Sequence, residues 1–349
     1  METKRKGDMK MLKVGVIGCG AIAQRRHLPE YLNRNDVEIV AVCDFNLERA
    51  KEVAKQFGAK HAFQTHQELL ACEDIEAVSV CAPNFLHASI TIESIQAGKH
   101  VLCEKPMATN LDEAKSMVDA ATEKGVKLMI GHSQRFMPVH IKAKEILDEG
   151  KLGRVLSFQT TFGHSGPENW SVDGKSSWFF NQDEAFAGVL GDLGVHKADL
   201  IRWLLNDEVS EITAMYGTLH KNTNVDDHAV LAIKTQKGAI GTLTASWTYY
   251  PNENNSTIIY CEKGTLKIGT DEQFGLIVEH QNKHRECYEL DKIQSNETGG
   301  QTNSGIIDHF VEGILNGTGH SVTGDDGYKA LEIVLAGINS ANQKQTISL

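Results

Sequence analysis

Short apolar segments rich in valine and isoleucine recur through about the first 130 residues, and segments with helical periodicity separate them. This alternation is typical of βαβ units, in which helices connect the parallel strands of one sheet. Six segments are predicted to form strands: Leu12–Ile17, Val37–Cys43, His61–Phe63, Ala77–Cys81, His100–Cys103 and Lys127–Ile130. Because crossovers between parallel strands are right-handed, these strands predict a doubly wound α/β sheet.

The connecting segments carry residues that begin and end helices. Asn46 is suited to cap a helix that runs through Phe57, and Gly58 follows the end of that helix. Thr65 and Glu68 have the spacing of a capping box, in which each side chain accepts a hydrogen bond from the other residue's backbone. These signals predict helices before and after the third strand.

The pattern changes after Pro138, which suits the first turn of a helix that ends near Leu147. Alternating apolar and polar positions predict strands at Arg154–Phe162, Ile212–Leu219, His228–Ile233 and Ile240–Tyr249. Helices are predicted at His196–Leu205, at Ile306–Leu315 and at a last segment that Asp325 or Asp326 caps and that ends near Asn339. Strands that are not alternated with helices favour an antiparallel sheet in an α+β domain.

Length and composition narrow the class of protein. At about 150 residues per domain, 349 residues suggest two domains, which we place at 1–133 and 134–349. A net charge of −11 without a long basic cluster argues against nucleic acid or an anionic membrane as the partner. No apolar run approaches the roughly 18 residues of a membrane span.

The cysteines argue against a disulfide framework or a zinc cluster. Their number is odd, at seven, and no Cys-x-x-Cys pair occurs. Cys43, Cys81 and Cys103 each lie in an apolar run. This usage predicts a reducing compartment, the cytoplasm.

The first predicted strand runs into Gly18-Cys19-Gly20-Ala21-Ile22-Ala23, a G-x-G-x-x-A fingerprint of dinucleotide binding. Gly18 permits the tight turn, Gly20 lets the backbone approach a pyrophosphate, and Ala23 allows close packing of the helix. The helix N-terminus supplies unpaired N–H groups and a positive dipole end to the phosphates. Gly18, Gly20, Ala21 and Ile22 are therefore predicted to bind the cofactor.

Asp44 ends the second strand, where a carboxylate accepts hydrogen bonds from an adenosine ribose. Its charge would repel a 2′-phosphate, and the next residues, Phe45 and Asn46, offer no arginine clamp. The predicted cofactor is therefore NAD rather than NADP. Arg25 and Arg26 in the first helix either reach a phosphate or lie solvated on an exposed face.

Polar residues also follow the fourth and fifth strands. Glu104-Lys105-Pro106 follows the fifth strand, and ligands of open α/β sheets bind at the carboxyl ends of strands. Lys105 is thus placed near the nicotinamide, where a cationic ring and an apolar wall can lower a lysine pKa enough for proton transfer. The competing interpretation is a surface lysine before a turn. Pro83-Asn84 follows the fourth strand, with His87 one turn on, and Asn84 either lines the nicotinamide pocket or caps the next helix.

Gly191-Asp192-Leu193-Gly194-Val195-His196 places an acid and a histidine four residues apart, one turn if the segment is helical. Asp192 would then accept a hydrogen bond from His196 or orient the substrate, while His196 acts as a base near neutral pH. Metal ligation is the competing interpretation. No third ligand stands at a recognisable spacing, so no metal is predicted. Asp227 and His228 look like a second such pair, but they begin a strand, and we expect a structural role for them.

Together, the glycine fingerprint, Asp44, Glu104-Lys105-Pro106 and the motif that ends at His196 resemble the glucose-fructose oxidoreductase / inositol dehydrogenase (Gfo/Idh/MocA) family. The resemblance covers nearly the whole chain. It implies a Rossmann domain followed by an α+β domain with a large, open, mostly antiparallel sheet. In this family the sheet commonly forms a dimer or tetramer interface, so we expect a homodimer or homotetramer.

The resemblance also implies roles for individual residues. Lys105, Asp192 and His196 would surround the reactive carbinol of a sugar or cyclitol, and the bond before Pro106 is often cis. The resemblance further implies positions for four residues: Asn84 and His87 near the nicotinamide, Glu104 beside the cofactor, and Arg135 at the junction of the domains. Phe136 stands where some relatives have a tyrosine, which puts the substrate in doubt but not the class.

A long stretch with little periodicity, Gly163–Gly188, is interpreted as a functional loop. Its residues His164, Trp170 and Trp178, with Arg135, are predicted to form the substrate wall, because aromatic faces pack on sugar C–H surfaces. Each of these side chains would otherwise pack in the core.

The hypothesis is a dehydrogenase that oxidises a secondary hydroxyl of a sugar, inositol or related polyol with NAD. His196 is the favoured base, held by Asp192, and Lys105 polarises the same oxygen; relatives differ in which group is the base. One alternative is a glycosidase that retains NAD and acts by transient oxidation and elimination. Another is a regulator that senses sugar or NAD, which would have no need of Lys105, Asp192 and His196 together.

Overall fold

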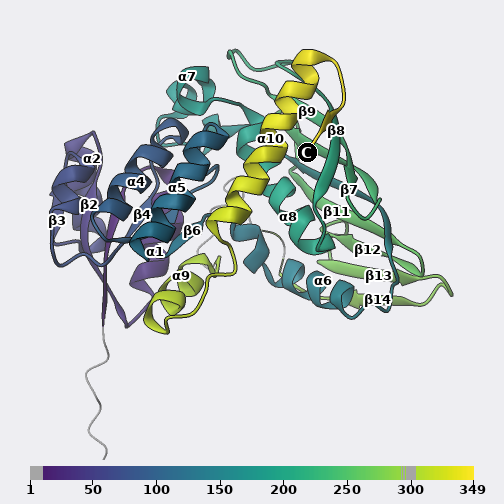
Figure 1. Ribbon diagram of the computed structural model, residues 1–349, viewed down its shortest axis with the longest axis horizontal. Helices are drawn as coiled ribbons and strands as arrows, with labels where there is room; N and C mark the ends of the chain where they lie inside the picture. The colour runs from purple at the N-terminus through teal and green to yellow at the C-terminus, as the bar shows by residue number, and fades with distance from the viewer. Residues whose placement is uncertain (1–10, 292, 294, 296–303) are drawn as a thin grey trace, which may run out of the picture.

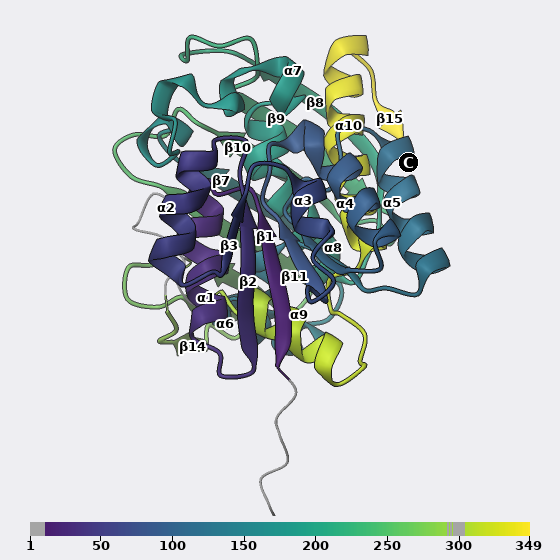
Figure 2. The same cartoon turned by 90° about the vertical axis from the view of Figure 1, so that its left-hand side faces the viewer.

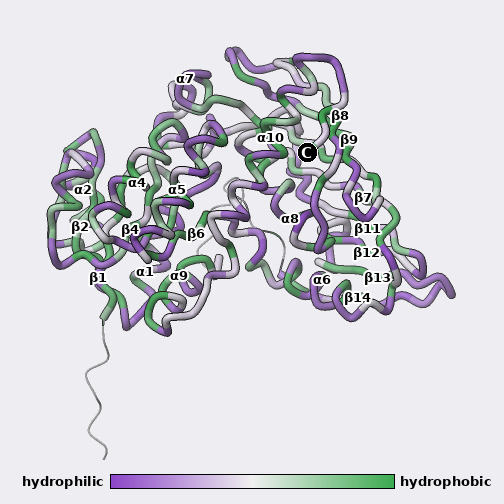
Figure 3. Tube along the Cα trace, viewed as in Figure 1, coloured by the Kyte–Doolittle hydropathy of each residue, from purple (hydrophilic) through white to green (hydrophobic). Residues whose placement is uncertain are grey.

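The computed structural model describes residues 11–291, 293, 295 and 304–349. Two β-sheets lie side by side, each covered by helices, and the long C-terminal helix α10 (Gly324–Gln343) runs between them (Figure 1). Hydrophobic stretches follow the strands of both sheets, whereas hydrophilic stretches gather in the loops at the rim (Figure 3). The two halves therefore have separate hydrophobic cores.

The first sheet is parallel and has the order β3-β2-β1-β4-β5-β6. Its strands are β1 (Leu12–Ile17), β2 (Val37–Cys43), β3 (His61–Phe63), β4 (Ala77–Val80), β5 (His100–Cys103) and β6 (Leu128–Ile130). The strand order reverses between β1 and β4, and this reversal opens a ligand-binding crevice at the carboxyl ends of the strands. The doubly wound sheet predicted from the sequence is confirmed.

Helices cover both faces of this sheet, with α1 and α2 on one side and α4 and α5 on the other (Figure 2). Their bounds are η1 (Ala23–His27), α1 (Leu28–Leu32), α2 (Leu47–Phe57), α3 (His66–Leu70), η2 (Asn84–Leu86), α4 (His87–Gln96), α5 (Leu111–Lys124) and η3 (Ser133–Phe136). The predicted caps are present. Asn46 accepts a hydrogen bond from the backbone of Arg49, and Thr65 forms a capping box with Glu68.

The second sheet has the order β14-β13-β12-β11-β7-β10-β9-β8-β15, and its neighbours are antiparallel except β7 and β10. Its strands are β7 (Val155–Gly163), β8 (Val209–Gly217), β9 (His228–Thr235), β10 (Ile240–Ser246), β11 (Asn254–Cys261), β12 (Gly264–Ile268), β13 (Leu276–His280), β14 (Arg285–Tyr288) and β15 (Ile347–Ser348). The mostly antiparallel sheet is confirmed, and the four strands predicted for it are present with shifted limits. The last five strands were not predicted.

Helices α6 (Pro138–Asp148), α8 (Val195–Leu205) and α10 cover the face of this sheet that is turned toward the first sheet (Figure 1). The N-cap of α10 is Thr323, and Asp326 completes a capping box with it. The prediction that Asp325 or Asp326 is the cap was therefore wrong by two or three positions. Thr323 has the extended backbone that an N-cap needs, whereas both aspartates already lie in the first helical turn.

Helix α9 (Ile306–Leu315) packs on the first sheet although it lies between β14 and β15 of the second sheet in the chain. Its residues Ile306 and Phe310 are fully buried in the same hydrophobic core as β1 and β4. The division at 133/134 stays a prediction, but the chain crosses between the two cores more than once.

The segment 164–188, here called the cleft loop, connects β7 to the helical turn before α8. It contains short helices only: η4 (Pro167–Asn169), η5 (Gly174–Ser176), η6 (Trp178–Phe180) and α7 (Gln182–Ala185). After it, η7 (Leu190–Gly194) has π-helical geometry and leads directly into α8. The long aperiodic stretch predicted from the sequence is thus a loop built of single turns.

Candidate active site

A cleft lies at the carboxyl ends of β1, β2, β4 and β5 and continues to α8 and the cleft loop. The following residues from the predicted site line it: Gly18, Gly20, Ala21, Ile22, Asp44, Pro83, Asn84, His87, Glu104, Lys105, His164, Trp170, Trp178, Asp192 and His196. Residues from both halves of the chain therefore meet in one cavity. Among the described residues, no group of three or more His, Cys, Asp or Glu side chains is arranged to hold a metal ion.

The glycine turn after β1 has the shape that a dinucleotide requires. Gly18 has φ of +92°, and a Cβ there would stand 2.5 Å from the carbonyl oxygen of Cys81, so a side chain is excluded. A Cβ on Gly20 would meet nothing within 4 Å, because this position faces the open cleft. The backbone at Gly20 is thus free to approach a pyrophosphate, and the residues fit the dinucleotide that the fingerprint predicts.

Asp44 stands at the end of β2 beside this turn. One carboxylate oxygen accepts a hydrogen bond from the backbone of Cys19 at 2.9 Å, and the other accepts one from Asn46 at 2.9 Å. Nη1 of Arg49 in α2 lies 3.9 Å from the carboxylate of Asp44, and Nη2 of the same arginine pairs with Asp173 of the cleft loop. Sequence reasoning considered only the two residues after Asp44 and missed this arginine, which stands one helical turn further on.

Glu104 lies under the cleft in a buried polar cluster. Its carboxylate pairs with His27 Nε2 at 2.9 Å and lies 3.7 Å from Arg26, while His27 Nδ1 reaches Ser79 at 3.0 Å. Burial alone would raise the pKa of Glu104, but the hydrogen bond from His27 and the positive charges nearby outweigh it and hold the pKa at about 2. Glu104 is therefore an anion.

Arg26 is buried in the same polar cluster, so the alternative that this arginine lies solvated on an exposed face is wrong. Its neighbour Arg25 is exposed.

Lys105 follows β5 and reaches across the cleft to the second half of the chain. Its Nζ donates hydrogen bonds to the carboxylate of Asp192 at 2.8 Å and to the backbone carbonyl of Asp192 at 2.9 Å. Trp247 Nε1 donates to the other carboxylate oxygen at 3.2 Å. The peptide bond between Lys105 and Pro106 is cis, as the family resemblance implied. Asp192 thus fixes the position of Lys105.

The structure contradicts the prediction that Asp192 accepts a hydrogen bond from His196. No hydrogen bond joins the two side chains, since both oxygens of Asp192 are engaged by Lys105 and Trp247. The reason lies in the helix: Leu190–Gly194 forms a π-helical turn, which is wider than an α-helical turn. Two side chains four residues apart therefore do not lie one above the other, as the spacing had suggested.

His196 lies in the first turn of α8 and lines the cleft. Its ring centre is 6.0 Å from that of Phe162 and 6.3 Å from that of His132. Burial, followed by the positive charge of Lys105, lowers the pKa of His196 well below its usual value. The imidazole is therefore neutral at physiological pH and can accept a proton.

Asn84 and His87 hold the walls of the cleft together. Asn84 Nδ2 donates to the carbonyl of Ala185 at 3.2 Å, so it ties β4 to the cleft loop, and the N-cap of α4 is Leu86 instead. His87 lies between two backbone carbonyls, of Pro106 and Ala82, each 2.7 Å from a ring nitrogen. His87 thereby links the segment that carries Lys105 to the end of β4.

Three residues of the cleft loop that are predicted to form the substrate wall line the cleft: His164, Trp170 and Trp178. Trp178 stacks on Phe179 with ring centres 3.9 Å apart, and the same phenylalanine meets Trp170 edge-on at 5.2 Å. His164 accepts a hydrogen bond from the backbone of Gly166, and burial lowers the pKa of His164 to about 4. The aromatic wall is therefore neutral and rigidly packed.

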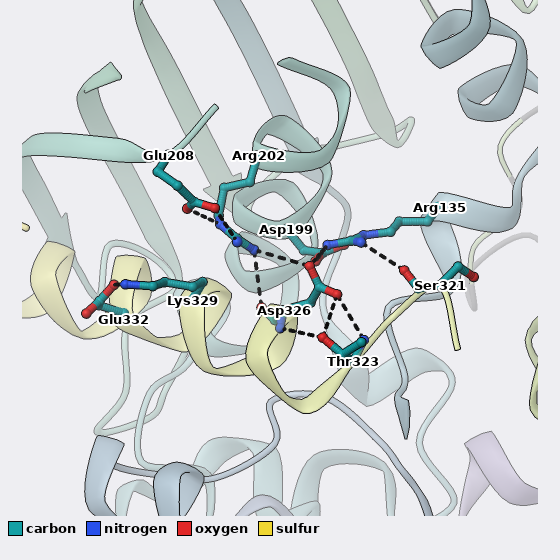
Figure 4. A network of polar contacts seen from close by, with 9 residues as sticks. All are labelled: Arg135, Asp199, Arg202, Glu208, Ser321, Thr323, Asp326, Lys329 and Glu332. Carbon is teal, nitrogen blue, oxygen red and sulfur yellow. Dashed lines mark hydrogen bonds and ion pairs between the residues drawn. The ribbon is translucent and has the colours of Figure 1, made fainter. Parts of the chain in front are cut away.

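Arg135 is not a wall residue, and this prediction was wrong. Its guanidinium makes an ion pair with Asp199, with Nε 2.8 Å from a carboxylate oxygen, and a second ion pair with Asp326 at 2.8 Å (Figure 4). A buried arginine needs such partners, and both of them come from helices that cover the second sheet. Ser133 and Gln134 line the cleft from this segment instead.

Two further residues have structural roles. Asp227 accepts three backbone hydrogen bonds from residues 219–221, and His228 pairs with Ser246 at 3.0 Å. The structural interpretation of this acid/histidine pair is therefore confirmed.

Phe136 stacks on His309 with ring centres 4.3 Å apart and does not line the cleft.

Family models match most of the chain. Residues 12–132 match the model described as "Oxidoreductase family, NAD-binding Rossmann fold", and residues 140–267 match the "GFO/IDH/MocA C-terminal domain". No helix among the described residues has the length and apolar character needed to cross a membrane.

Named relatives agree with these matches. The chain is 31% identical to levoglucosan dehydrogenase of Pseudarthrobacter phenanthrenivorans over 74% of this chain and 73% of the relative. It is 28% identical to 1,5-anhydro-D-fructose reductase of Ensifer adhaerens over 97% of this chain and 99% of the relative. A solved structure of levoglucosan dehydrogenase with NADH and levoglucosan superposes with a TM-score of 0.85 at 27% identity, over 97% of this chain and 99% of that one. The chain belongs to the Gfo/Idh/MocA family of NAD-binding oxidoreductases.

Proposed function

We propose that the protein oxidises a secondary hydroxyl of an uncharged sugar or related polyol by hydride transfer to NAD. The observation that carries the proposal is the meeting of Lys105, held by Asp192, with a neutral His196 at the end of the cleft that begins at the glycine turn. A hydrogen-bond donor and a proton acceptor then stand where a dinucleotide on this turn would extend its nicotinamide.

Bound NAD supplies the hydride acceptor, and the chain supplies orientation and proton transfer. Lys105 donates a hydrogen bond to the reacting oxygen, and Asp192 keeps its ammonium group in place. The neutral His196 accepts the hydroxyl proton as the C–H bond breaks. Glu104, which is bonded to His27 and lines the cleft beside Lys105, would favour a cationic nicotinamide ring through its negative charge.

The reaction end of the cleft suits a neutral substrate. Lys105 is matched by Asp192 and Arg26 by Glu104, so these charges leave no surplus cation for a phosphate group. Trp170 and Trp178 offer flat apolar faces, which pack on the C–H surfaces of a sugar ring. The named relatives include a levoglucosan dehydrogenase, a D-glucoside 3-dehydrogenase of Escherichia coli and a myo-inositol 2-dehydrogenase of Thermotoga maritima, which supports a pyranose or cyclitol ring.

The test is a panel of levoglucosan, methyl glucosides, glucose, glucose 6-phosphate and inositol isomers, each with NAD and with NADP. The proposal expects NADH to accumulate at 340 nm with a neutral ring substrate and NAD. Release of sugar from a glycoside without net NADH would point to the NAD-retaining glycosidase instead. Sugar binding without turnover of any panel member would favour the regulator.

We further infer that the helix-free face of the second sheet pairs with a second copy of the chain. Met215 and Ile240 on this face are 81% and 59% exposed, and Val230 lies beside Met215 on the next strand. Apolar side chains this exposed on one sheet face favour a protein interface. Light scattering should find an oligomer for the natural chain and a monomer for the double variant Met215→Glu, Ile240→Glu; an unchanged mass would contradict the inference.

A further inference from the structure

A second histidine lies behind His196, away from the cleft. His132 follows β6 and is 1% exposed, and its ring meets the ring of His196 edge-on, at 6.3 Å between centres and 81° between planes. Neither ring nitrogen of His132 has a hydrogen-bond partner among the described residues, and neither does Nδ1 of His196. Three enclosed imidazole nitrogens therefore share one small region.

Such nitrogens are costly when they stay unpaired. Burying a polar group without a partner destabilises a fold, so several such nitrogens in one place call for an explanation. The two rings make no direct hydrogen bond, and one water molecule can bridge polar groups at this kind of separation. Nδ1 is the enclosed nitrogen of His196, so Nε2 is the nitrogen on the cleft side.

The electrostatics explain why His196 needs an outlet for a proton. Lys105, His132 when it is protonated, Arg26 and Lys197 all oppose a second proton on the ring of His196. Around His132 the charges have both signs. The carboxylates of Asp199 and Asp326 raise the pKa of His132, whereas the positive charges of Arg135 and Lys105 lower it.

Burial lowers the pKa of His132, while Asp199 acts in the opposite direction. The largest charge effects on His132 include two carboxylates, whereas the largest charge effects on His196 all come from positive groups, so a proton is better placed on His132. The carboxylate of Asp326, one of the charges that act on His132, is 23% exposed at the start of α10.

We propose that His132 is the proton-relay partner of His196 in the oxidation, an inference that rests on the proposed function. As the substrate hydroxyl gives its proton to Nε2 of His196, the proton on Nδ1 passes to a bridging water, and that water gives a proton to a ring nitrogen of His132. The substrate loses one proton, His132 gains one, and His196 ends neutral in its other tautomer. His132 releases the proton to solvent before the next turnover.

The test compares His132→Phe, which keeps a ring without nitrogens, with the control variant His320→Phe. His320 is a histidine whose ring nitrogens also lack hydrogen-bond partners among the described residues, and its ring packs on Phe310 of α9 instead of His196. We expect His132→Phe to lower kcat at least tenfold with KM and the Kd of NADH within about twofold, because proton transfer contributes about 10²–10⁴-fold to such reactions. The acid limb of the pH profile of kcat should also move in His132→Phe. In the control His320→Phe, kcat and its pH profile should stay as in the natural chain.

A second readout needs neither sugar nor turnover. In protein labelled with ¹⁵N-histidine, the relay requires that His196 hold its proton on Nδ1 in the natural chain and lose this preference in His132→Phe. A proton on Nε2 of His196 in the natural chain, or a natural kcat and pH profile in His132→Phe, would overturn the relay. If no sugar of the panel reduces NAD, the proposed function fails, while the NMR measurement still decides whether the two histidines are coupled.

Discussion

Replacing Lys105 by methionine removes the ammonium group while keeping most of the volume of the side chain. In the structure Nζ is 2.8 Å from the carboxylate of Asp192, and the two side chains are only 14% and 5% exposed, so the hydrogen bond that Lys105 gives to a reacting oxygen acts in a partly desolvated site. Loss of one such donor to a developing oxyanion costs about 2.7–4 kcal/mol, or about 10²–10³-fold in kcat. Binding of NAD should change by less than about threefold, because the glycine turn and Asp44 remain.

The assay is the initial rate of NADH formation with the best sugar of the panel, together with a fluorescence titration of NADH. The control is Lys175→Met, which removes an exposed lysine of the cleft loop that does not line the cleft. A natural kcat in Lys105→Met would refute the role of Lys105. A large loss of NADH affinity with little change in kcat would show that Lys105 acts in cofactor binding.

Three other predictions follow from single contacts. Asp192→Asn should lower kcat about tenfold or more, because Lys105 loses its counterion, and steady-state rates at 340 nm check this. Asp44→Ser should raise the NADP to NAD ratio of kcat/KM at least tenfold, and adding Arg49→Leu should remove most of the gain, because Arg49 already stands 3.9 Å from Asp44; initial rates with both cofactors decide. Burial lowers the pKa of His140 from 6.5 to about 3, so the unfolded chain binds the extra proton first and stability is lost as pH falls below 6.5. Between pH 6.5 and 5, His140 should lower the free energy of unfolding by about 2 kcal/mol. Urea titrations of the natural chain and of His140→Asn at both pH values measure this contribution.

The first sheet was predictable because its strands, except the short edge strand β3, are buried on both faces and appear as apolar runs. Most of the strands missed in the second half do not have that pattern, although β13 begins with a buried apolar run. In β11 the inward positions include Asn255 and Thr257, and Thr257 pairs with Thr160 at 2.8 Å instead of meeting an apolar neighbour. Hydropathy therefore does not alternate there, although burial does. The edge strand β14 is short and half-exposed on both faces.

The residue types of the candidate site were predictable, but their pairing was not. Motifs identify Lys105 and Asp192 separately, and they meet across 87 residues of sequence. The π-helical turn that separates Asp192 from His196 has no signature in the spacing, so the sequence indicated the wrong partner. Arg135 was misplaced because its partners, Asp199 and Asp326, come from two distant helices.

A deuterium label on the sugar follows hydride transfer from the sugar carbon to NAD directly. The sugar that the panel selects is prepared with deuterium at its ring carbons, and the reduced cofactor is examined by mass spectrometry. Hydride transfer should leave one deuterium in the reduced nicotinamide for each ketone formed, with a slower rate than for the unlabelled sugar. Ketone or free sugar formed without deuterium in the cofactor would contradict it.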